Sequence, residues 1–178
     1  VVVSILLLLN DIASTLNQHE LALNYLKNAL NIAKSGEVSM DQIIEIQYRL
    51  GKTFYKLDDH ENSSHHFNVL LNTLTSSMFD QDDEDLPLPS NERDKFLGMS
   101  YLYLGLLNLK REEISQSKEN FKKAFHIASE NVYVRLKYHL LRGRYFKKRG
   151  NISQALKLLK IALKSMQKVL ENVDVMEK

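Results

Sequence analysis

The chain contains no cysteine, and it has only two prolines and six glycines among its 178 residues. The absence of cysteine excludes a disulfide framework, a thiolate nucleophile and a cysteine-ligated zinc site. The scarcity of glycine and proline disfavours an all-β fold, which needs many turns. Hydrophobic residues make up 44% and charged residues 26%, and a chain of this length is long enough for one sizeable domain with its own core.

Long apolar runs are also missing, since the longest one covers only residues 1–9. A transmembrane helix needs about 20 apolar residues, and a signal peptide needs a basic start and a small-residue cleavage site. We therefore expect no membrane span and an intracellular protein, cytoplasmic or nuclear. The run is interpreted as a helix that is buried on most sides because another element packs on it. We therefore expect this chain to be a segment of a longer protein with further repeats at both ends.

The net charge of +2 hides an uneven distribution along the chain. Residues 1–130 contain 12 Lys or Arg against 19 Asp or Glu, whereas residues 131–178 contain 12 against 3. Between Glu130 and Glu171 there are 11 basic residues and no acidic one. Such an asymmetry influences electrostatic steering and the choice of partner rather than the fold.

A weak internal repeat is the most informative pattern in the chain. In each copy a glycine, or an asparagine in the first copy, is followed on the next predicted helix by a small residue and, four residues later, a large apolar one. The four copies are Asn10 with Ala22 and Leu26, Gly51 with Ser63 and Phe67, Gly105 with Ser117 and Phe121, and Gly143 with Ala155 and Leu159. We expect the small residues to let two helices approach closely while the large residue fills the space one turn on.

The spacing of apolar residues predicts four helical hairpins in a single domain over residues 1–178. Asn17 with Glu20, and Asn151 with Gln154, predict capping boxes inside the first and fourth hairpins. Between the second and third hairpins five acidic residues precede both prolines, which predicts an acidic mobile loop over 79–91. The hairpins are expected at about 2–35, 39–77, 92–130 and 132–172.

The third copy of the repeat carries the fullest motif: Tyr101, Leu104 and Gly105, then Ser117, Phe121 and Ala124. This pattern resembles the tetratricopeptide repeat, which has an aromatic residue and Leu-Gly on its first helix and Ala, Phe and Ala on its second. Successive copies lie 41, 54 and 38 residues apart, against 34 in the standard unit, so the resemblance is to a long-repeat variant. It implies an all-α fold, a right-handed α-solenoid of about four antiparallel helix hairpins. A HEAT-like helical solenoid is the alternative.

In tetratricopeptide proteins the first helix of each hairpin lines a concave groove that receives an extended peptide or a partner helix. By register, the resemblance implies partner-binding residues at Tyr48, Lys52, Tyr55, Lys137, Arg144, Lys147 and Lys148. Apolar residues of the third hairpin also fall at groove positions, with packing as their alternative role: Met99, Leu102, Leu106 and Leu109. The groove is expected to be basic at its C-terminal end, which suits a ligand with an apolar anchor and acidic flanks.

These observations predict a non-catalytic protein–protein interaction scaffold, a subunit of a larger complex that binds a partner peptide or helix. The sequence has no phosphate-binding glycine loop, no Gly-x-Ser-x-Gly elbow and no distinctive pair of carboxylates, so no enzyme activity is expected. His60, His65 and His66 lack the spacing that favours a metal site. We expect neither a metal nor a cofactor.

Three alternatives stay open. The first is a nucleic-acid-associated subunit, in which the basic segment 131–168 would neutralise phosphates. Interspersed aromatic residues such as Tyr133 and Tyr138 would stack on bases. We rank this hypothesis below protein binding. The second alternative is a peptide-sensing regulator built from these repeats. The third is a regulatory domain attached to an enzyme. A chaperone-tail binder is disfavoured because Leu7 and Asp11 occupy the positions of its basic and Asn clamp.

Overall fold

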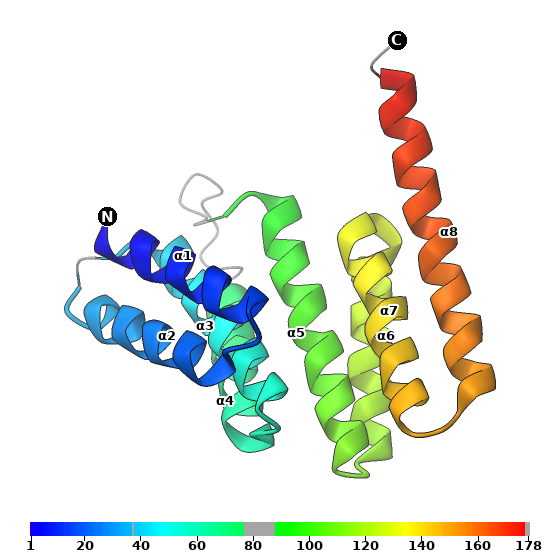
Figure 1. The fold of residues 1–178 in the computed structure, drawn as a ribbon, viewed down its shortest axis with the longest axis horizontal. Coiled ribbons are helices and arrows are strands. Elements are labelled where there is room, and N and C mark those ends of the chain that lie inside the picture. Colours follow the sequence, from blue (N-terminus) through cyan, green and yellow to red (C-terminus); the bar gives the residue numbers. More distant parts are fainter. Residues whose placement is uncertain (37, 77–87, 177–178) are drawn as a thin grey trace. The chain divides into compact units, whose positions relative to one another are not determined.

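The computed structural model describes residues 1–36, 38–76 and 88–176, and in the last helix it describes side chains up to residue 167. This part of the chain contains eight helices and no strand (Figure 1), which confirms the all-α helical-hairpin fold. The helices are α1 (Val2–Thr15), α2 (His19–Ala33), α3 (Met40–Lys56), α4 (His60–Ser76), α5 (Ser90–Lys110), α6 (Ile114–Glu130), α7 (Val132–Lys148) and α8 (Ile152–Met176). The loop predicted over 79–91 lies outside the described residues up to position 87, and α5 begins at Ser90.

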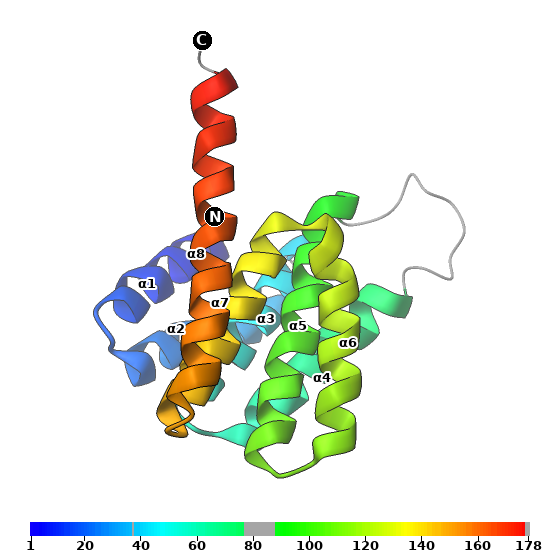
Figure 2. The same cartoon turned by 90° about the vertical axis from the view of Figure 1, so that its right-hand side faces the viewer.

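The chain divides into two compact units, Val1–Pro89 and Ser90–Lys178. In the first unit α1 packs on α2, α2 on α3 and α3 on α4. In the second unit α5 packs on α6, α6 on α7 and α7 on α8, and α5 also contacts α7 (Figure 2). Each unit therefore stacks two hairpins through neighbouring helices, as helical-repeat proteins do. The prediction of a single domain over the whole chain stays a prediction.

Close packing at the repeated glycines is confirmed in three hairpins. A Cβ atom added at any of these glycines would lie under 3.0 Å from the large residue of the same copy, a separation that real Cβ atoms essentially never show. The shortest distances from such a Cβ atom are 2.8 Å to the Phe67 ring at Gly51, 2.8 Å to the Phe121 ring at Gly105 and 2.9 Å to the Leu159 side chain at Gly143. Only a residue without a side chain lets the two helices of these hairpins pack this closely.

The small residue of the motif makes a hydrogen bond that its size alone does not predict. The Ser63 hydroxyl donates to the Gly51 carbonyl oxygen at 2.8 Å, and the Ser117 hydroxyl donates to the Gly105 carbonyl oxygen at 2.9 Å. All four residues are buried, and a buried hydroxyl without a partner destabilises the fold. Serine therefore serves as both a small residue and a cross-hairpin donor.

A left-handed residue ends the first helix of every hairpin, seven positions after the marker glycine or asparagine. These residues are Asn17 (φ 58°), Asp58 (φ 57°), Glu112 (φ 64°) and Gly150 (φ 78°). The next residue donates its N–H to a carbonyl five positions back, as from Gln18 to Ala13 at 2.9 Å and from Glu113 to Asn108 at 2.9 Å. This is the Schellman arrangement, and its recurrence shows the repeat at the level of the backbone.

The predicted capping box at Asn17 and Glu20 is wrong. Asn17 takes the left-handed conformation that closes α1, which asparagine tolerates better than most residues. Gln18 then becomes the N-cap of α2 and makes no side-chain cap hydrogen bond. In the fourth hairpin, by contrast, Asn151 Oδ1 accepts from the Gln154 N–H at 3.1 Å, so the predicted capping asparagine is confirmed.

Gly98 provides a further close approach that the repeat pattern does not predict. A Cβ atom at this position of α5 would lie 2.6 Å from Cγ1 of Val134 in α7. Val134 is fully buried, so this contact fixes the spacing between the first helices of two successive hairpins. In the first unit, buried apolar residues of α1, α2 and α3 form one core cluster: Val3, Leu26, Ala29, Ile46, Leu50 and Phe54.

We predict that Gly51→Ala destabilises the chain by up to about 2 kcal/mol in urea unfolding. Overpacking against the fully buried Phe67 costs about 1–3 kcal/mol, more than the gain of about 1 kcal/mol in helix propensity. Phe67→Leu should restore part of the loss in the double variant, although it destabilises the wild-type chain. Additive effects of the two substitutions would show that the side chains at positions 51 and 67 do not contact each other.

Replacing Glu112 by glycine should stabilise the chain by roughly 0.5–1 kcal/mol, measured by urea unfolding. Left-handed strain of about 1–2 kcal/mol is removed, which exceeds the entropy cost of glycine of about 0.5–1 kcal/mol. Glu112→Ala is the matched control, because it removes the same side chain and keeps the strain. An equal gain from both substitutions would contradict the backbone explanation.

Candidate functional site

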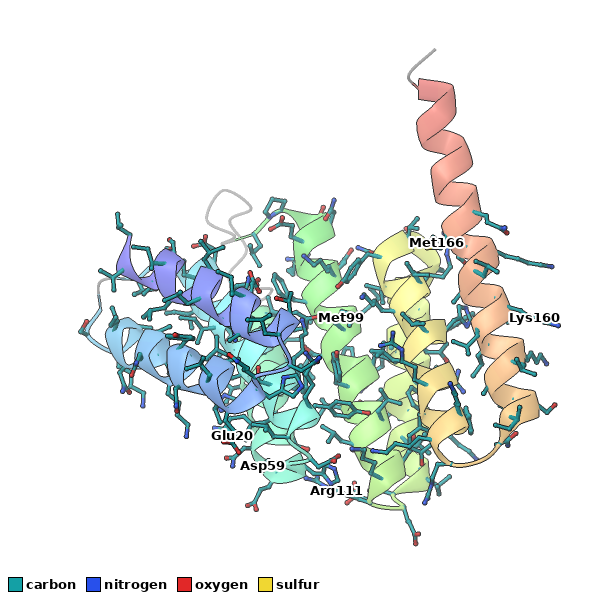
Figure 3. The ribbon with its side chains drawn as sticks, in the orientation of Figure 1. Glu20, Asp59, Met99, Arg111, Lys160 and Met166 are labelled. Atoms are coloured by element: carbon teal, nitrogen blue, oxygen red, sulfur yellow. The ribbon has the colours of Figure 1, made fainter. Side chains whose placement is uncertain are left out.

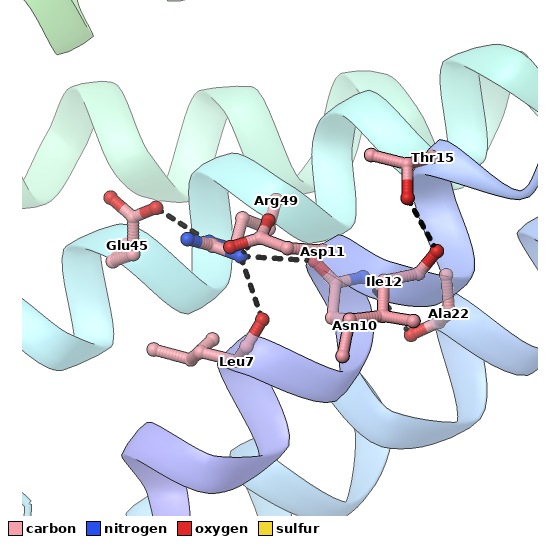
Figure 4. A network of polar contacts seen from close by, with 8 residues as sticks. All are labelled: Leu7, Asn10, Asp11, Ile12, Thr15, Ala22, Glu45 and Arg49. Carbon is pink, nitrogen blue, oxygen red and sulfur yellow. Dashed lines mark hydrogen bonds and ion pairs between the residues drawn. The ribbon is translucent and has the colours of Figure 1, made fainter.

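A polar network joins α1 to α3 in the first unit (Figure 4). Arg49 Nη1 donates to the Leu7 carbonyl oxygen at 3.0 Å, to Asn10 Oδ1 at 3.2 Å and to Asp11 Oδ1 at 2.5 Å. Its Nε donates to Glu45 Oε1 at 2.5 Å. Burial by itself lowers the pKa of Arg49, but the hydrogen bonds and charges of Glu45 and Asp11 outweigh it and raise the pKa. The guanidinium is therefore a fixed, fully charged centre.

Asn10 connects three helices and explains why the first copy of the repeat has no glycine. Its side chain is buried, its Oδ1 accepts from Arg49 of α3, and its Nδ2 donates to the Ala22 carbonyl oxygen of α2 at 3.2 Å. The bond to Ala22 reproduces, with the direction reversed along the chain, the serine bonds of the second and third hairpins. By sequence this position corresponds to the glycine of the other copies, and in the structure Asn10 has a hydrogen-bonding role of its own.

A small polar cavity of about 110 Å³ adjoins this network. Its lining comes from α1 and α3: Asn10, Asp11, Ser14, Glu45, Arg49, Lys52, Thr53 and Lys56. Small-molecule and cofactor sites usually measure about 300–1,000 Å³, so this cavity has room for a single functional group of a ligand. Three cationic side chains line it against two carboxylates, and both carboxylates already bind Arg49.

The structure places Lys52, but not the whole of the predicted α3 set, at this cavity. The Lys52 ammonium lies 5.0 Å from the ring centroid of Tyr48, a cation–π distance. Tyr48 is only 5% exposed and its ring meets Phe67 edge-on, with centroids 6.4 Å apart. Tyr55 is partly exposed. Tyr48 is thus a support beneath Lys52, and the binding role of all three residues stays a prediction.

On α7 the predicted basic residues differ in their surroundings. Lys137 is partly exposed, with its ammonium 5.4 Å from the ring centroid of Tyr133. Arg144, Lys147 and Lys148 are exposed. Lys147 and Lys148 occupy the last turn of the helix, where a cation interacts favourably with the helix dipole. Part of this charge therefore stabilises α7 itself.

Arg142 of α7 is a partly exposed residue that packs on aromatic rings, and sequence reasoning did not assign it to the site. Its guanidinium carbon lies 4.7 Å from the ring centroid of Phe121 and 4.8 Å from that of Tyr138. Nη1 also donates to the Tyr138 hydroxyl at 2.6 Å. An arginine four residues after a tyrosine on a helix is a signal for such a contact. The Phe121 contact depends on how α6 and α7 pack, and the sequence does not contain it directly.

His66 of α4 is a partly buried titratable group in the first unit. Its ring stacks on Phe54, with centroids 5.4 Å apart, and its Nδ1 lies 2.7 Å from Gln47 Oε1. The pKa of His66 is lowered to about 4: burial is the main cause, the charge of His65 contributes in the same direction, and Asp59 opposes the shift. His66 is therefore neutral near pH 7 and donates to Gln47.

Among residues 1–36, 38–76 and 88–176, no group of three or more His, Asp or Glu side chains is placed to hold a metal ion. None of the helices in this described part combines the length and apolar character that crossing a bilayer requires.

Comparisons with known proteins add little to this description. No protein-family model matches the chain, and no curated protein matches it. A solved structure titled "Crystal structure of MamA" aligns over 91% of this chain and 96% of its own, with 17% sequence identity and a TM-score of 0.35. The helical hairpins and their repeated packing themselves define this chain as a helical-repeat protein.

The stability of the chain should fall as the pH drops from about 6.5 toward 4 because of His66. The unfolded chain binds a proton near pH 6.5 and the folded chain only near pH 4, so protonation favours unfolding. At about 1.4 kcal/mol per pKa unit the loss is at most roughly 3 kcal/mol, and solvent screening of the partly exposed ring makes it smaller. Urea unfolding at about pH 7 and about pH 5 should show a smaller decrease for His66→Asn than for wild type. Equal decreases would exclude His66 as the cause.

Proposed function

We propose that this chain is a tetratricopeptide-like, non-catalytic scaffold, a subunit of a larger complex that binds an acidic segment of a partner protein. The supporting observation is the basic face of α7, where Arg144, Lys147 and Lys148 are exposed. Neither α7 nor the part of α8 whose side chains are described contains an acidic residue. A cationic surface without internal counter-charges attracts acidic partners and speeds their association.

In the first unit, the proposed contact is the cavity that Lys52 and Lys56 line together with the Arg49 network. Its volume of about 110 Å³ suits one carboxylate or amide group of a peptide. Tyr48 and Tyr55 belong to this proposal through their position on the same helix as Lys52, Tyr48 as a support and Tyr55 as a contact. Each unit thus offers its own binding surface, and the proposal does not require that they form one groove.

Aromatic contacts favour a protein ligand over nucleic acid. Base stacking needs accessible rings, but Tyr138 is buried and packs against Phe121. Tyr145 is only partly exposed, and its hydroxyl donates to the Leu109 carbonyl oxygen at 3.4 Å. Tyr133 is more exposed, but Lys95 and Lys137 lie over its ring. The rings interspersed with the basic residues are thus largely engaged within the protein.

Further helical repeats of the same protein are part of this proposal. Val2, Ile5, Leu8 and Ile12 form one face of α1, and each is about half exposed. An apolar stripe with this spacing on a helix is normally covered by another helix. A neighbouring repeat provides such a helix in stacked architectures.

The test is affinity capture of the full-length protein, with and without nuclease, beside the variant Lys137→Glu/Arg144→Glu/Lys147→Glu. Protein partners should survive nuclease and be lost from the variant. The matched control is Lys27→Glu/Lys34→Glu/Lys118→Glu, which makes the same change of charge at exposed lysines in α2, just after α2 and in α6. It should retain the partners.

Two outcomes would contradict the proposal. If partners bind the α7 variant as well as they bind wild type, the basic residues of α7 are only solvated and do not contribute to binding. Partners lost after nuclease treatment would instead favour a nucleic-acid-associated subunit. Circular dichroism of each variant should match wild type, because the substituted residues are exposed or partly exposed.

A further inference from the structure

The last helix offers a second surface, distinct from α7. One face of α8 is used for folding, since Ala155, Leu158 and Ala162 are buried and Leu159 packs on Gly143 of α7. Beside this face, four apolar side chains stay exposed: Ile152 (53%), Leu156 (53%), Leu163 (51%) and Met166 (44%). Their separations of 4, 7 and 3 residues place them in one stripe along the helix. This stripe is apolar surface that the fold leaves uncovered.

A row of lysines runs beside the apolar stripe. Lys157, Lys160 and Lys164 are all exposed, and Lys160 projects from α8 on the side away from α7 (Figure 3). Lys160 lies four residues after Leu156 and three before Leu163, so the two rows are neighbours on the helix surface. No acidic residue occurs in α8 before Glu171. The surface therefore combines an apolar ridge with uncompensated positive charge.

We propose that this surface, Ile152–Met166 of α8, docks an acidic amphipathic helix of a partner protein. The apolar side of that helix packs on Ile152, Leu156, Leu163 and Met166, and its row of Glu or Asp faces the three lysines. Charge complementarity selects this occupant: an apolar helix without acids leaves the lysines unpaired, while an acidic helix pairs them and gains specificity.

Other occupants fit the surface less well. A second copy of the chain would bring two lysine rows together, and like charges repel. Nucleic acid gains nothing from the aliphatic ridge, which has no exposed aromatic ring for stacking. A bilayer takes up a broad apolar face, and the broad apolar face of α8 is already covered by α7. A stripe about one side chain wide matches the ridge-and-groove packing of one helix on another.

The test uses the whole chain and a fluorescent synthetic helix of about 18 residues, or five turns, with leucines at helical spacing flanked by glutamates. Binding is followed by fluorescence anisotropy. A matched peptide with Gln for every Glu should bind about tenfold more weakly. The triple variant Lys157→Glu/Lys160→Glu/Lys164→Glu should lose the acidic peptide, and a third peptide with Lys for every Glu should bind that variant in its place. Leu156→Ser should weaken all of these interactions.

The controls separate this proposal from the one made for α7. The Lys137→Glu/Arg144→Glu/Lys147→Glu variant should still bind the acidic peptide, so either proposal can fail alone. Lys118→Glu/Lys122→Glu on α6 controls for a general change of charge. Equal binding of the Glu and Gln peptides, or no binding of either, would overturn the α8 proposal. So would a failed charge swap, or binding of phosphatidylserine-containing vesicles or a DNA duplex in place of the peptide.

Discussion

The close approach of the two helices in each hairpin is the constraint on which the rest of the structure depends. At Gly51, Gly105 and Gly143 the large residue of the facing helix occupies the space where a Cβ atom would lie. This contact fixes which face of each first helix turns inward. On α3 that leaves Arg49 and Lys52 on the side of α1, and on α7 it leaves the basic residues exposed. The surfaces proposed for binding are therefore consequences of the hairpin packing.

Much of the fold follows from residues whose physical role is local. The glycine, small and large positions predict where two helices touch, because a side chain at the glycine would fill space that the partner helix occupies. Asn151 as a cap was equally predictable. Asn17 misled because asparagine suits both an N-cap and a left-handed C-terminal residue. Glu112 in a left-handed conformation contradicts its own preference, so only the repeat's turn geometry accounts for it.

The candidate sites were less predictable because they depend on tertiary neighbours. Register placed Lys52 on the correct helix, but the four acceptors of Arg49 come from two helices and include a backbone carbonyl. Nothing in the sequence around Arg142 indicates its contact with Phe121, because that ring lies on α6. For Tyr48 the register predicts a partner-binding position, and packing leaves only 5% of the residue exposed. A helical pattern predicts which residues share a face, and packing decides what covers them.

The most direct test of the central claim is a nuclear Overhauser measurement on the isotope-labelled chain. Cross-peaks should join the α protons of Gly51 to the ring protons of Phe67, and those of Gly105 to the ring protons of Phe121. The α protons of Gly36 and Gly150 should show no such contacts, because nothing lies within 4 Å of a Cβ atom placed there. Missing cross-peaks at Gly51 and Gly105 in the folded protein would contradict the hairpin packing on which this account of the fold rests.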